Sequence, residues 1–158
     1  GDACWMSPGA RISASDEIVI GDGCMMAHGS YITDSDWHGI YNRVNRDETV
    51  KPVRLGNNVW LGDRSTVLKG VTIGDNSIVA ASSVVTKDIP ANVIVAGNPA
   101  VIVRELDEGE TRYTRSDMFA NPEETMAYFR SLDATLLAEN TTWRWLTSAI
   151  FPRSRREQ

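Results

Sequence analysis

A repeat of six residues dominates the middle of the sequence. Its leading position is aliphatic each time, at Leu55, Leu61, Val67, Ile73, Val79 and Val85. The next position is mostly small, and the position four residues after the leading one is small or aliphatic. A period of six fits neither an amphipathic helix, with its period of 3.6 residues, nor a long alternating strand. The repeat predicts a coil of very short strands and tight turns around a narrow core.

The repeat continues upstream with one irregularity. Its aliphatic positions there are Met6, Ile12, Ile20, Met26 and Ile32. The phase slips by two residues between Ile12 and Ile20, so we expect a bulge or a lengthened turn in residues 16–19. Cys4 and Cys24 fall in the same small inward position on neighbouring coils, and we expect both thiols to be buried and unpaired. Gly1 and Asp2 match the second and third positions of a hexapeptide, so we expect the chain to begin inside a coil.

The repeat divides the chain into regions. Residues 1–104 carry it, interrupted by a long polar loop at residues 33–53, and such an excursion is usually functional or disordered. Residues 105–120 are charged and weakly patterned, which predicts a linker. An asparagine, a proline and two glutamates at residues 121–124 predict a helix start, with an amide cap and a glutamate that bonds back to it. A second short helix is expected after Thr141 or Thr142, so helices fill residues 121–152 and a basic tail follows at 153–158.

Three phrases of the sequence resemble the hexapeptide-repeat acyltransferases, and most of all the maltose, galactoside and xenobiotic O-acetyltransferases. They are Leu55–Gly62, Lys69–Ser77, and Val84–Pro90 with Ala96–Ala100. The resemblance covers about residues 1–104 and implies an all-β solenoid, a left-handed parallel β-helix, to which the C-terminal helices are an extension. It also implies a homotrimer with active sites between subunits. The activity it implies is transfer of an acetyl or other short acyl group from acyl-coenzyme A to a hydroxyl of a sugar or related small acceptor, with no metal.

Acyl transfer to an alcohol needs a base for the hydroxyl proton, and histidine suits this role because its pKa lies near neutrality. The chain has two histidines. The resemblance places the catalytic histidine in the long loop, which favours His38, whereas His28 occupies an exposed position of a repeat. Asp36 or Asp34 is a candidate to orient the imidazole of His38 by accepting its other ring proton. The alternative is that these aspartates cap the backbone of their own loop.

Coenzyme A presents phosphates, which favour Lys or Arg, and a pantetheine arm that can pair with backbone along a coil edge. Carried over residue by residue, the resemblance points to Trp60, Asp63, Ala81, Thr86, Lys87 and Arg104 as acyl-coenzyme A contacts. Each also has a structural interpretation: Trp60 can fill a subunit contact, and Lys87 can be a solvated turn residue.

Several functional classes fit the composition poorly. A net charge of −5 argues against a nucleic-acid binder, which needs a basic surface. Two cysteines without disulfide spacing indicate a reducing compartment, by default the cytoplasm. The sequence has no run of about 18 apolar residues that would span a bilayer. The tryptophans and arginines of residues 143–156 fit helices docked on the trimer, with contact to a membrane surface as the alternative.

Two rival functions share the predicted fold. A γ-type carbonic anhydrase needs three imidazoles around its zinc, and this chain has two histidines. A non-catalytic trimeric scaffold is the stronger rival, because fold alone does not determine function. Protection by acetyl-coenzyme A in a thermal melt would separate an enzyme from such a scaffold.

Overall fold

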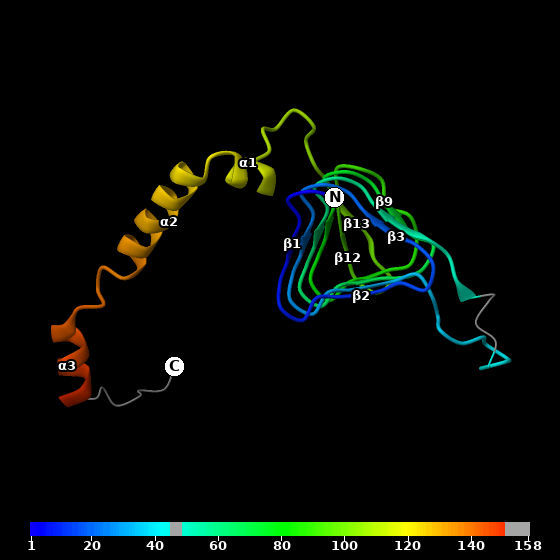
Figure 1. Ribbon diagram of the computed structural model, residues 1–158, viewed down its shortest axis with the longest axis horizontal. Coiled ribbons are helices and arrows are strands. Elements are labelled where there is room, and N and C mark those ends of the chain that lie inside the picture. Colours follow the sequence, from blue (N-terminus) through cyan, green and yellow to red (C-terminus); the bar gives the residue numbers. More distant parts are fainter. Residues whose placement is uncertain (45–48, 151–158) are drawn as a thin grey trace. The chain divides into compact units, whose positions relative to one another are not determined.

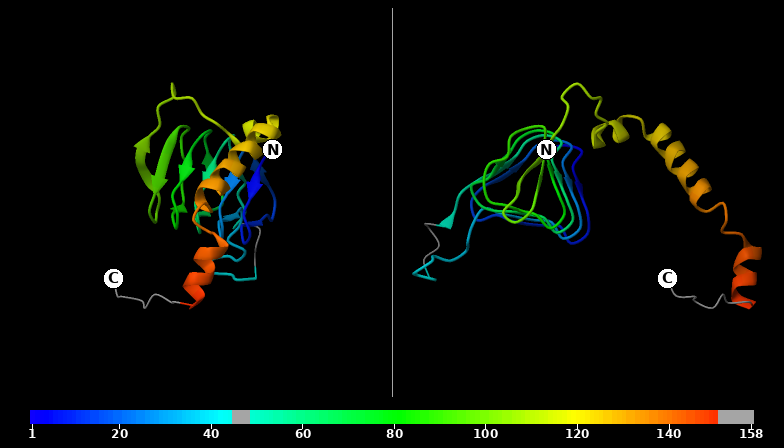
Figure 2. Two further views of the ribbon diagram at one scale, coloured as in Figure 1. Left: turned by 90° about the vertical axis from the view of Figure 1, so that its left-hand side faces the viewer. Right: turned by 180° about the vertical axis from the view of Figure 1, so that it is seen from behind.

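The computed structural model describes residues 1–44 and 49–150, and its first part is a three-sided coil of short strands (Figures 1 and 2). The strands are β1 (Trp5–Met6), β2 (Arg11–Ser13), β3 (Ile18–Ile20), β4 (Met25–Met26), β5 (Tyr31–Thr33), β6 (Val53–Leu55), β7 (Trp60–Leu61), β8 (Thr66–Val67), β9 (Thr72–Ile73), β10 (Ile78–Val79), β11 (Val84–Val85), β12 (Val93–Ala96) and β13 (Val101–Glu105). Their brevity follows from the repeat, since each hexapeptide supplies one strand and one turn.

The strands form three sheets, which the chain visits in turn. The first has the order β1-β4-β7-β10-β12-β13, the second β11-β8-β5-β2, and the third β3-β6-β9. Pairing is parallel except between β12 and β13, which are antiparallel. Beyond β9, the third sheet continues only as a bridge between Ile73 and Ile89. The short parallel strands that the repeat predicts are therefore present, and the antiparallel β13 is an addition that the repeat did not predict.

The core consists of the columns that the sequence predicts to point inward. From Leu55 to Val85, the side chains of the leading column are at most 3% exposed. The small position is equally buried at Val59, Ser65, Val71, Ser77 and Ser83. The predicted register is confirmed over this part of the chain. Such close packing leaves little room for a change of volume or polarity.

The first coil departs from this pattern. Met6 is 52% exposed and Ile12 38% exposed, although both occupy the leading column. Cys24 is buried as expected, but the expectation for Cys4 was wrong, because its thiol is exposed. The reason is that β1 and β2 are the outermost strands of their sheets, so among the described residues this coil is packed against a neighbour on one side.

The turn between the third and first sheets carries a ladder of asparagines. Asn58, Asn76 and Asn92 all have positive φ angles, between 55° and 60°. The side-chain amide of Asn58 donates to Asn76 Oδ1 at 3.1 Å, and that of Asn76 donates to Asn92 Oδ1 at 3.0 Å. Asparagine tolerates this left-handed conformation better than other side chains with a Cβ. The ladder therefore fixes both the turn conformation and the stacking of successive coils.

The chain divides into two compact units, residues 1–117 and 118–158. Three helices, α1 (Arg115–Ala120), α2 (Pro122–Leu136) and α3 (Thr142–Ile150), occupy its C-terminal part. Both helices expected in residues 121–152 are present, but the side chain of Asn121 makes no capping hydrogen bond. The basic tail at 153–158 lies outside the described residues. Within the described ranges, no helix is long and apolar enough to cross a membrane.

Helix α1 lies in the segment expected to be a linker. Asp117 Oδ2 accepts hydrogen bonds from the Thr114 backbone N–H at 2.6 Å and from the Thr114 hydroxyl at 2.9 Å. These bonds hold the pKa of Asp117 below its ordinary value. A threonine followed three residues later by an acid is a helix-start signal, so the sequence did contain this information.

Candidate active site

The long loop leaves the coil after β5 and returns at β6, and its root is closed by pairing between its two ends. Ser35 and Val50 form an antiparallel bridge, and the Lys51 N–H donates to the Asp34 carbonyl at 2.8 Å. The hydroxyls of Ser35 and Thr49 lie 3.3 Å apart. Residues 45–48 lie outside the described part of the loop. The closed root fixes the direction in which the loop emerges from the coil.

His38 lies on the outgoing side of this loop and is exposed. Its Nδ1 lies 2.8 Å from the carbonyl oxygen of Arg43. A carbonyl only accepts, so this hydrogen bond requires a proton on Nδ1, and in the neutral imidazole the lone pair is then on Nε2. A neutral imidazole with a free Nε2 is the form that a general base needs.

The hydrogen bond that orients His38 therefore goes to a backbone carbonyl, whereas Asp36 has another partner. The Asp36 carboxylate forms an ion pair with Lys69 Nζ at 2.5 Å. Lys69 follows β8, one coil further along the chain. Asp36 thus connects the loop to the next coil.

Asp34 does cap backbone groups, but these belong to the preceding coil and not, as the alternative interpretation expected, to its own loop. It is fully buried, and its two carboxylate oxygens accept the backbone N–H groups of Ser15 and Asp16, each at 2.7 Å. These donors belong to the turn between β2 and β3, where the repeat slips by two residues. The lengthened turn expected from the sequence therefore supplies the backbone N–H groups that bind a buried aspartate.

His28, the other histidine, occupies the exposed repeat position that the sequence predicts. Its Nδ1 lies 2.6 Å from the carbonyl oxygen of Pro8. A Cβ added to Gly9 would lie 3.0 Å from His28 Cε1, so the ring lies closely over the glycine of the preceding coil. His28 is integrated into the coil turns, whereas His38 is presented by a loop.

The six residues expected to contact acyl-coenzyme A are all exposed, and they lie on one sheet and in three turns. Trp60 and Arg104 are on the first sheet, in β7 and β13. Asp63 and Ala81 lie in the turns that leave this sheet, where the Ser82 N–H donates to the Asp63 carbonyl at 2.7 Å. A Cβ on Gly62 would lie 2.7 Å from the Ala81 nitrogen, so glycine permits the close approach of these turns.

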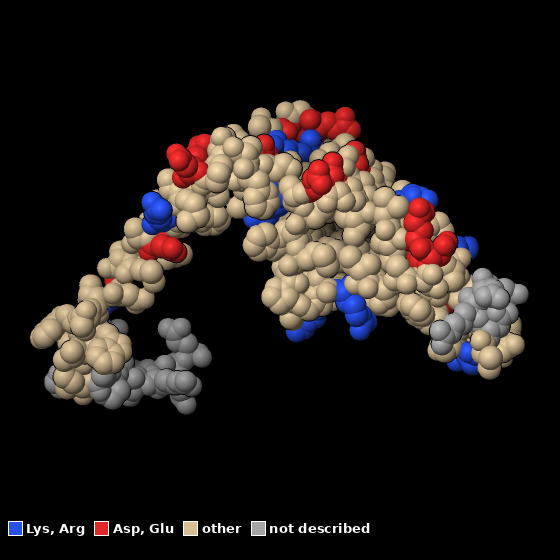
Figure 3. Space-filling view, in the orientation of Figure 1, with Lys and Arg blue, Asp and Glu red and all other residues tan. Residues whose placement is uncertain are grey.

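Thr86 and Lys87 lie in a different turn, after β11 in the second sheet. The long loop leaves the same sheet, after β5. Within one chain, the first sheet and the turns leaving it therefore present four of the candidates, and the turn after the second sheet presents two. On the face of the coil seen in Figure 3, Lys and Arg are interspersed with Asp and Glu.

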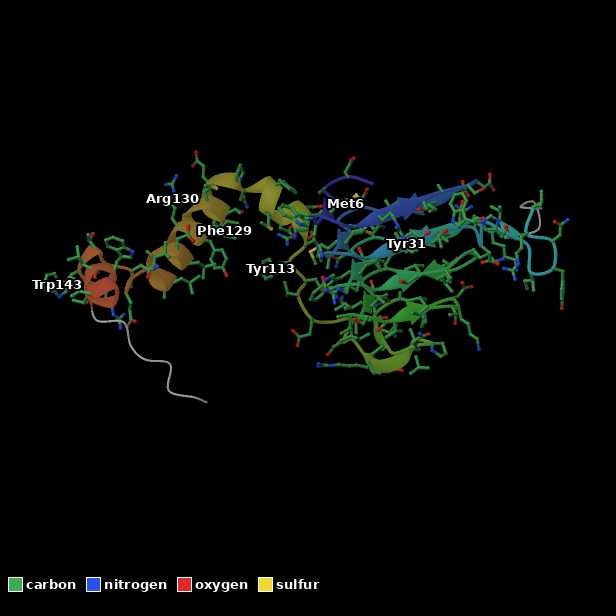
Figure 4. The ribbon with its side chains drawn as sticks, turned by 90° about the horizontal axis from the view of Figure 1, so that it is seen from below. Met6, Tyr31, Tyr113, Phe129, Arg130 and Trp143 are labelled. Carbon is green, nitrogen blue, oxygen red and sulfur yellow. The ribbon has the colours of Figure 1, made fainter. Side chains whose placement is uncertain are left out.

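Tyr31 and Arg11 form a polar aromatic pair that the sequence reasoning missed. The Arg11 guanidinium lies 4.1 Å from the centre of the Tyr31 ring (Tyr31 is labelled in Figure 4). Hydrogen bonding with Thr33, above all, lowers the pKa of the Tyr31 phenol. The signal was present, because both residues immediately precede leading positions, Ile12 and Ile32, and so stack on neighbouring coils.

Comparison with known proteins agrees with the repeat and the fold. Residues 52–87 match the family model described as "Bacterial transferase hexapeptide (six repeats)". The chain is 36% identical over 102 residues to the galactoside O-acetyltransferase of Escherichia coli, which is 63% of this chain and 50% of that protein. The chain spans about half the length of the curated relatives it matches.

Solved structures give the same result. A galactoside acetyltransferase in complex with coenzyme A matches with a TM-score of 0.56 and 29% identity, over 72% of this chain and 70% of that one. A hexapeptide-repeat acetyltransferase of Vibrio cholerae, complexed with acetyl-coenzyme A, matches with a TM-score of 0.53 and 28% identity, over 66% of each chain. The repeat and the three parallel sheets thus agree with the similarity to the hexapeptide-repeat transferase class. Within that class, its resemblance to the O-acetyltransferases is confirmed.

Proposed function

We propose that this protein is a coenzyme-A-dependent O-acetyltransferase, which moves an acetyl or other short acyl group to a hydroxyl of a sugar or related small acceptor. The observation that carries the proposal is the contact of His38 Nδ1 with the Arg43 carbonyl, which in the neutral ring assigns the lone pair to Nε2. The similarity to acetyltransferases whose structures contain coenzyme A or acetyl-coenzyme A supports the choice of donor.

The same similarity supports a left-handed β-helix assembled as a homotrimer, with each active site between subunits. Such an assembly would account for the arrangement of the candidate residues. One chain presents them on a sheet and at separate turns, so two chains would together line a long cleft. In this cleft, Lys87 and Arg104 are the residues suited to the phosphates of the donor.

The proposed reaction uses Nε2 of His38 as the base. Nε2 removes the proton of the acceptor hydroxyl as the oxygen attacks the thioester carbonyl. The resulting tetrahedral intermediate expels the coenzyme A sulfur, which takes up the proton from the imidazolium. The Arg43 carbonyl keeps Nδ1 protonated throughout, so the ring holds its orientation while Nε2 gains and loses the proton.

The proposal is tested by replacing His38 with alanine. We expect turnover to fall about a hundredfold or more, the usual range for the loss of a general base, with coenzyme A binding retained. His28→Ala is the matched control and should have little effect. An active His38→Ala enzyme would overturn the mechanism, and if the two results were exchanged, the base would be His28.

The acceptor is to be found by assay. A panel of sugars and amines, incubated with acetyl-coenzyme A and followed by release of the free thiol, would show which class accepts the acetyl group. Acetyl-coenzyme A should also raise the melting temperature of the protein. Absence of both turnover and this protection would favour a non-catalytic scaffold.

A further inference from the structure

Asp34 is a buried carboxylate at the root of the loop that carries His38. Its side chain is 0% exposed, and each of its oxygens accepts one backbone N–H at 2.7 Å. Burial of a charged group is costly unless it is hydrogen-bonded, and hydrogen bonds to a charged acceptor are roughly twice as strong as neutral ones. Two short bonds to one carboxylate therefore make a rigid attachment point.

The donors for this carboxylate come from the irregular turn of the preceding coil. Strand β2 ends at Ser13, and β3 begins at Ile18. Ser13 and Thr33 are partners in the pairing of β2 with β5, so the lengthened turn and the start of the loop lie at the same corner of neighbouring coils. The turn is lengthened by two residues, and it contains the two successive N–H groups, those of Ser15 and Asp16, that bind Asp34.

A second attachment holds the loop from the other side. Asp36 pairs with Lys69 of the following coil at 2.5 Å, and the Lys69 side chain is only 23% exposed. The Asp34 carbonyl also accepts the N–H of Lys51, which joins the outgoing and returning ends of the loop. The root of the loop is therefore fastened to the coil before it, the coil after it and its own return.

We propose that Asp34, together with the Asp36–Lys69 ion pair, forms a clamp that positions His38 for proton transfer. His38 follows Asp34 by four residues, and the clamp acts on it through the loop backbone, so both aspartates are positioning residues. The inference rests on the proposed function of His38 as the base. A base displaced by about 1 Å can lose about a hundredfold in rate, which is why a fixed root matters.

The test is Asp34→Asn in the full chain. Asparagine keeps the side-chain volume of Asp34. Its NH2 group cannot accept a hydrogen bond, so one of the two backbone N–H groups loses its acceptor. We expect kcat to fall at least about tenfold, with the KM for acetyl-coenzyme A unchanged. Hydrogen exchange at residues 35–44 should accelerate, while the strands of the coil keep their protection. Asp75→Asn is the matched control, because the Asp75 carboxylate accepts one backbone N–H at 2.7 Å, from Asn57, at a corner without the loop.

A double-mutant cycle separates positioning of His38 from a general effect on the fold. If the clamp acts through His38, Asp34→Asn should have no further effect on the residual activity of His38→Ala. An equal loss of kcat in both backgrounds would overturn the proposal. So would an unchanged kcat in Asp34→Asn, or a loss that only follows the folded fraction.

Lys69→Gln gives a second route to the same test if Asp34→Asn does not fold. This variant leaves Asp34 intact and frees Asp36, and we expect the same pattern of kcat and loop exchange at smaller amplitude. Unchanged exchange and unchanged kcat would overturn the clamp. If His38→Ala proves fully active while either variant loosens the loop, then the proposed base is wrong and the loop attachment stands by its exchange data.

Discussion

The two units of the chain bury their apolar side chains to very different extents. In the coil, the leading column from Leu55 to Val85 is almost completely buried. In the unit of residues 118–158, α2 has no buried residue, and Leu136 and Trp143 are 76% and 75% exposed. Figure 4 shows Phe129 and Trp143 projecting from their helices. Each coil supplies the packing partner of the next, whereas the helices are specified by local signals and bury little within their own unit.

The largest expected effect is in the coil core. Ile73→Asp should abolish folding, because it buries a carboxylate without a partner at a position that is 0% exposed. Leu136→Asp, on the exposed face of α2, should leave the melting transition of the coil unchanged. Circular dichroism and thermal melts of both variants test the contrast. A soluble, folded Ile73→Asp protein would contradict the assigned register.

A moderate effect is expected in the asparagine ladder of the coil. Asn76→Ala removes two side-chain hydrogen bonds and places alanine at a φ of 60°, so we expect a loss of roughly 2 kcal/mol in the free energy of unfolding. Asn76→Gly keeps access to the positive φ and should lose about half as much. Denaturant titration measures both. Equal losses would show that the ladder bonds, and not the backbone conformation, dominate.

A smaller contrast separates the edge of the coil from its interior. Cys4 should react rapidly with a thiol reagent in the folded protein, whereas Cys24 should react only on unfolding. Burial removes the Cys24 thiol from water and raises its pKa to about 11, so little of the reactive thiolate forms at pH 8. Mass spectrometry after timed labelling distinguishes the two. Equal labelling rates would mean that the second coil opens as readily as the first.

The smallest effect concerns the start of α1. Hydrogen bonds from Thr114 hold the pKa of Asp117 below 3.8, so their stabilisation of the helix start is present above this pH and is lost as pH falls through the folded pKa. Exchange of the Thr114 amide should accelerate in acid, and Asp117→Asn should abolish this pH dependence. A Thr114 amide that stays protected in acid would argue against the cap.

The features that could be predicted from the sequence are those encoded by the six-residue period or by helix-start residues. The buried column at Leu61 and Ile73 follows from the period of six, and α2 begins at Pro122 close to its expected start. The exposure of Cys4 depends on which coil lies at the edge, which a repeat does not indicate. The antiparallel β13 lies beyond the last clear hexapeptide, so no column marked it.

A candidate base could be named from the sequence, whereas the contacts that support it could not. The loop position of His38 followed from the interrupted repeat and the resemblance. Its partner is the carbonyl of Arg43, and a backbone acceptor leaves no trace in a sequence. Lys69 and Ser15 bind residues of the loop from neighbouring coils. Such contacts depend on how the coils stack in three dimensions, so they could not be predicted from the sequence.

The closed root of the loop has a consequence for how such proteins diverge. The bridge between Ser35 and Val50 ends the excursion before the coil resumes, and Leu55 pairs with Ile73 in the regular register. Residues between these ends can be added or removed without shifting any coil. Each doubling of loop length costs only about 0.6 kcal/mol in closure entropy. Evolution can therefore lengthen or shorten the surroundings of His38 while the register of the coil stays unchanged.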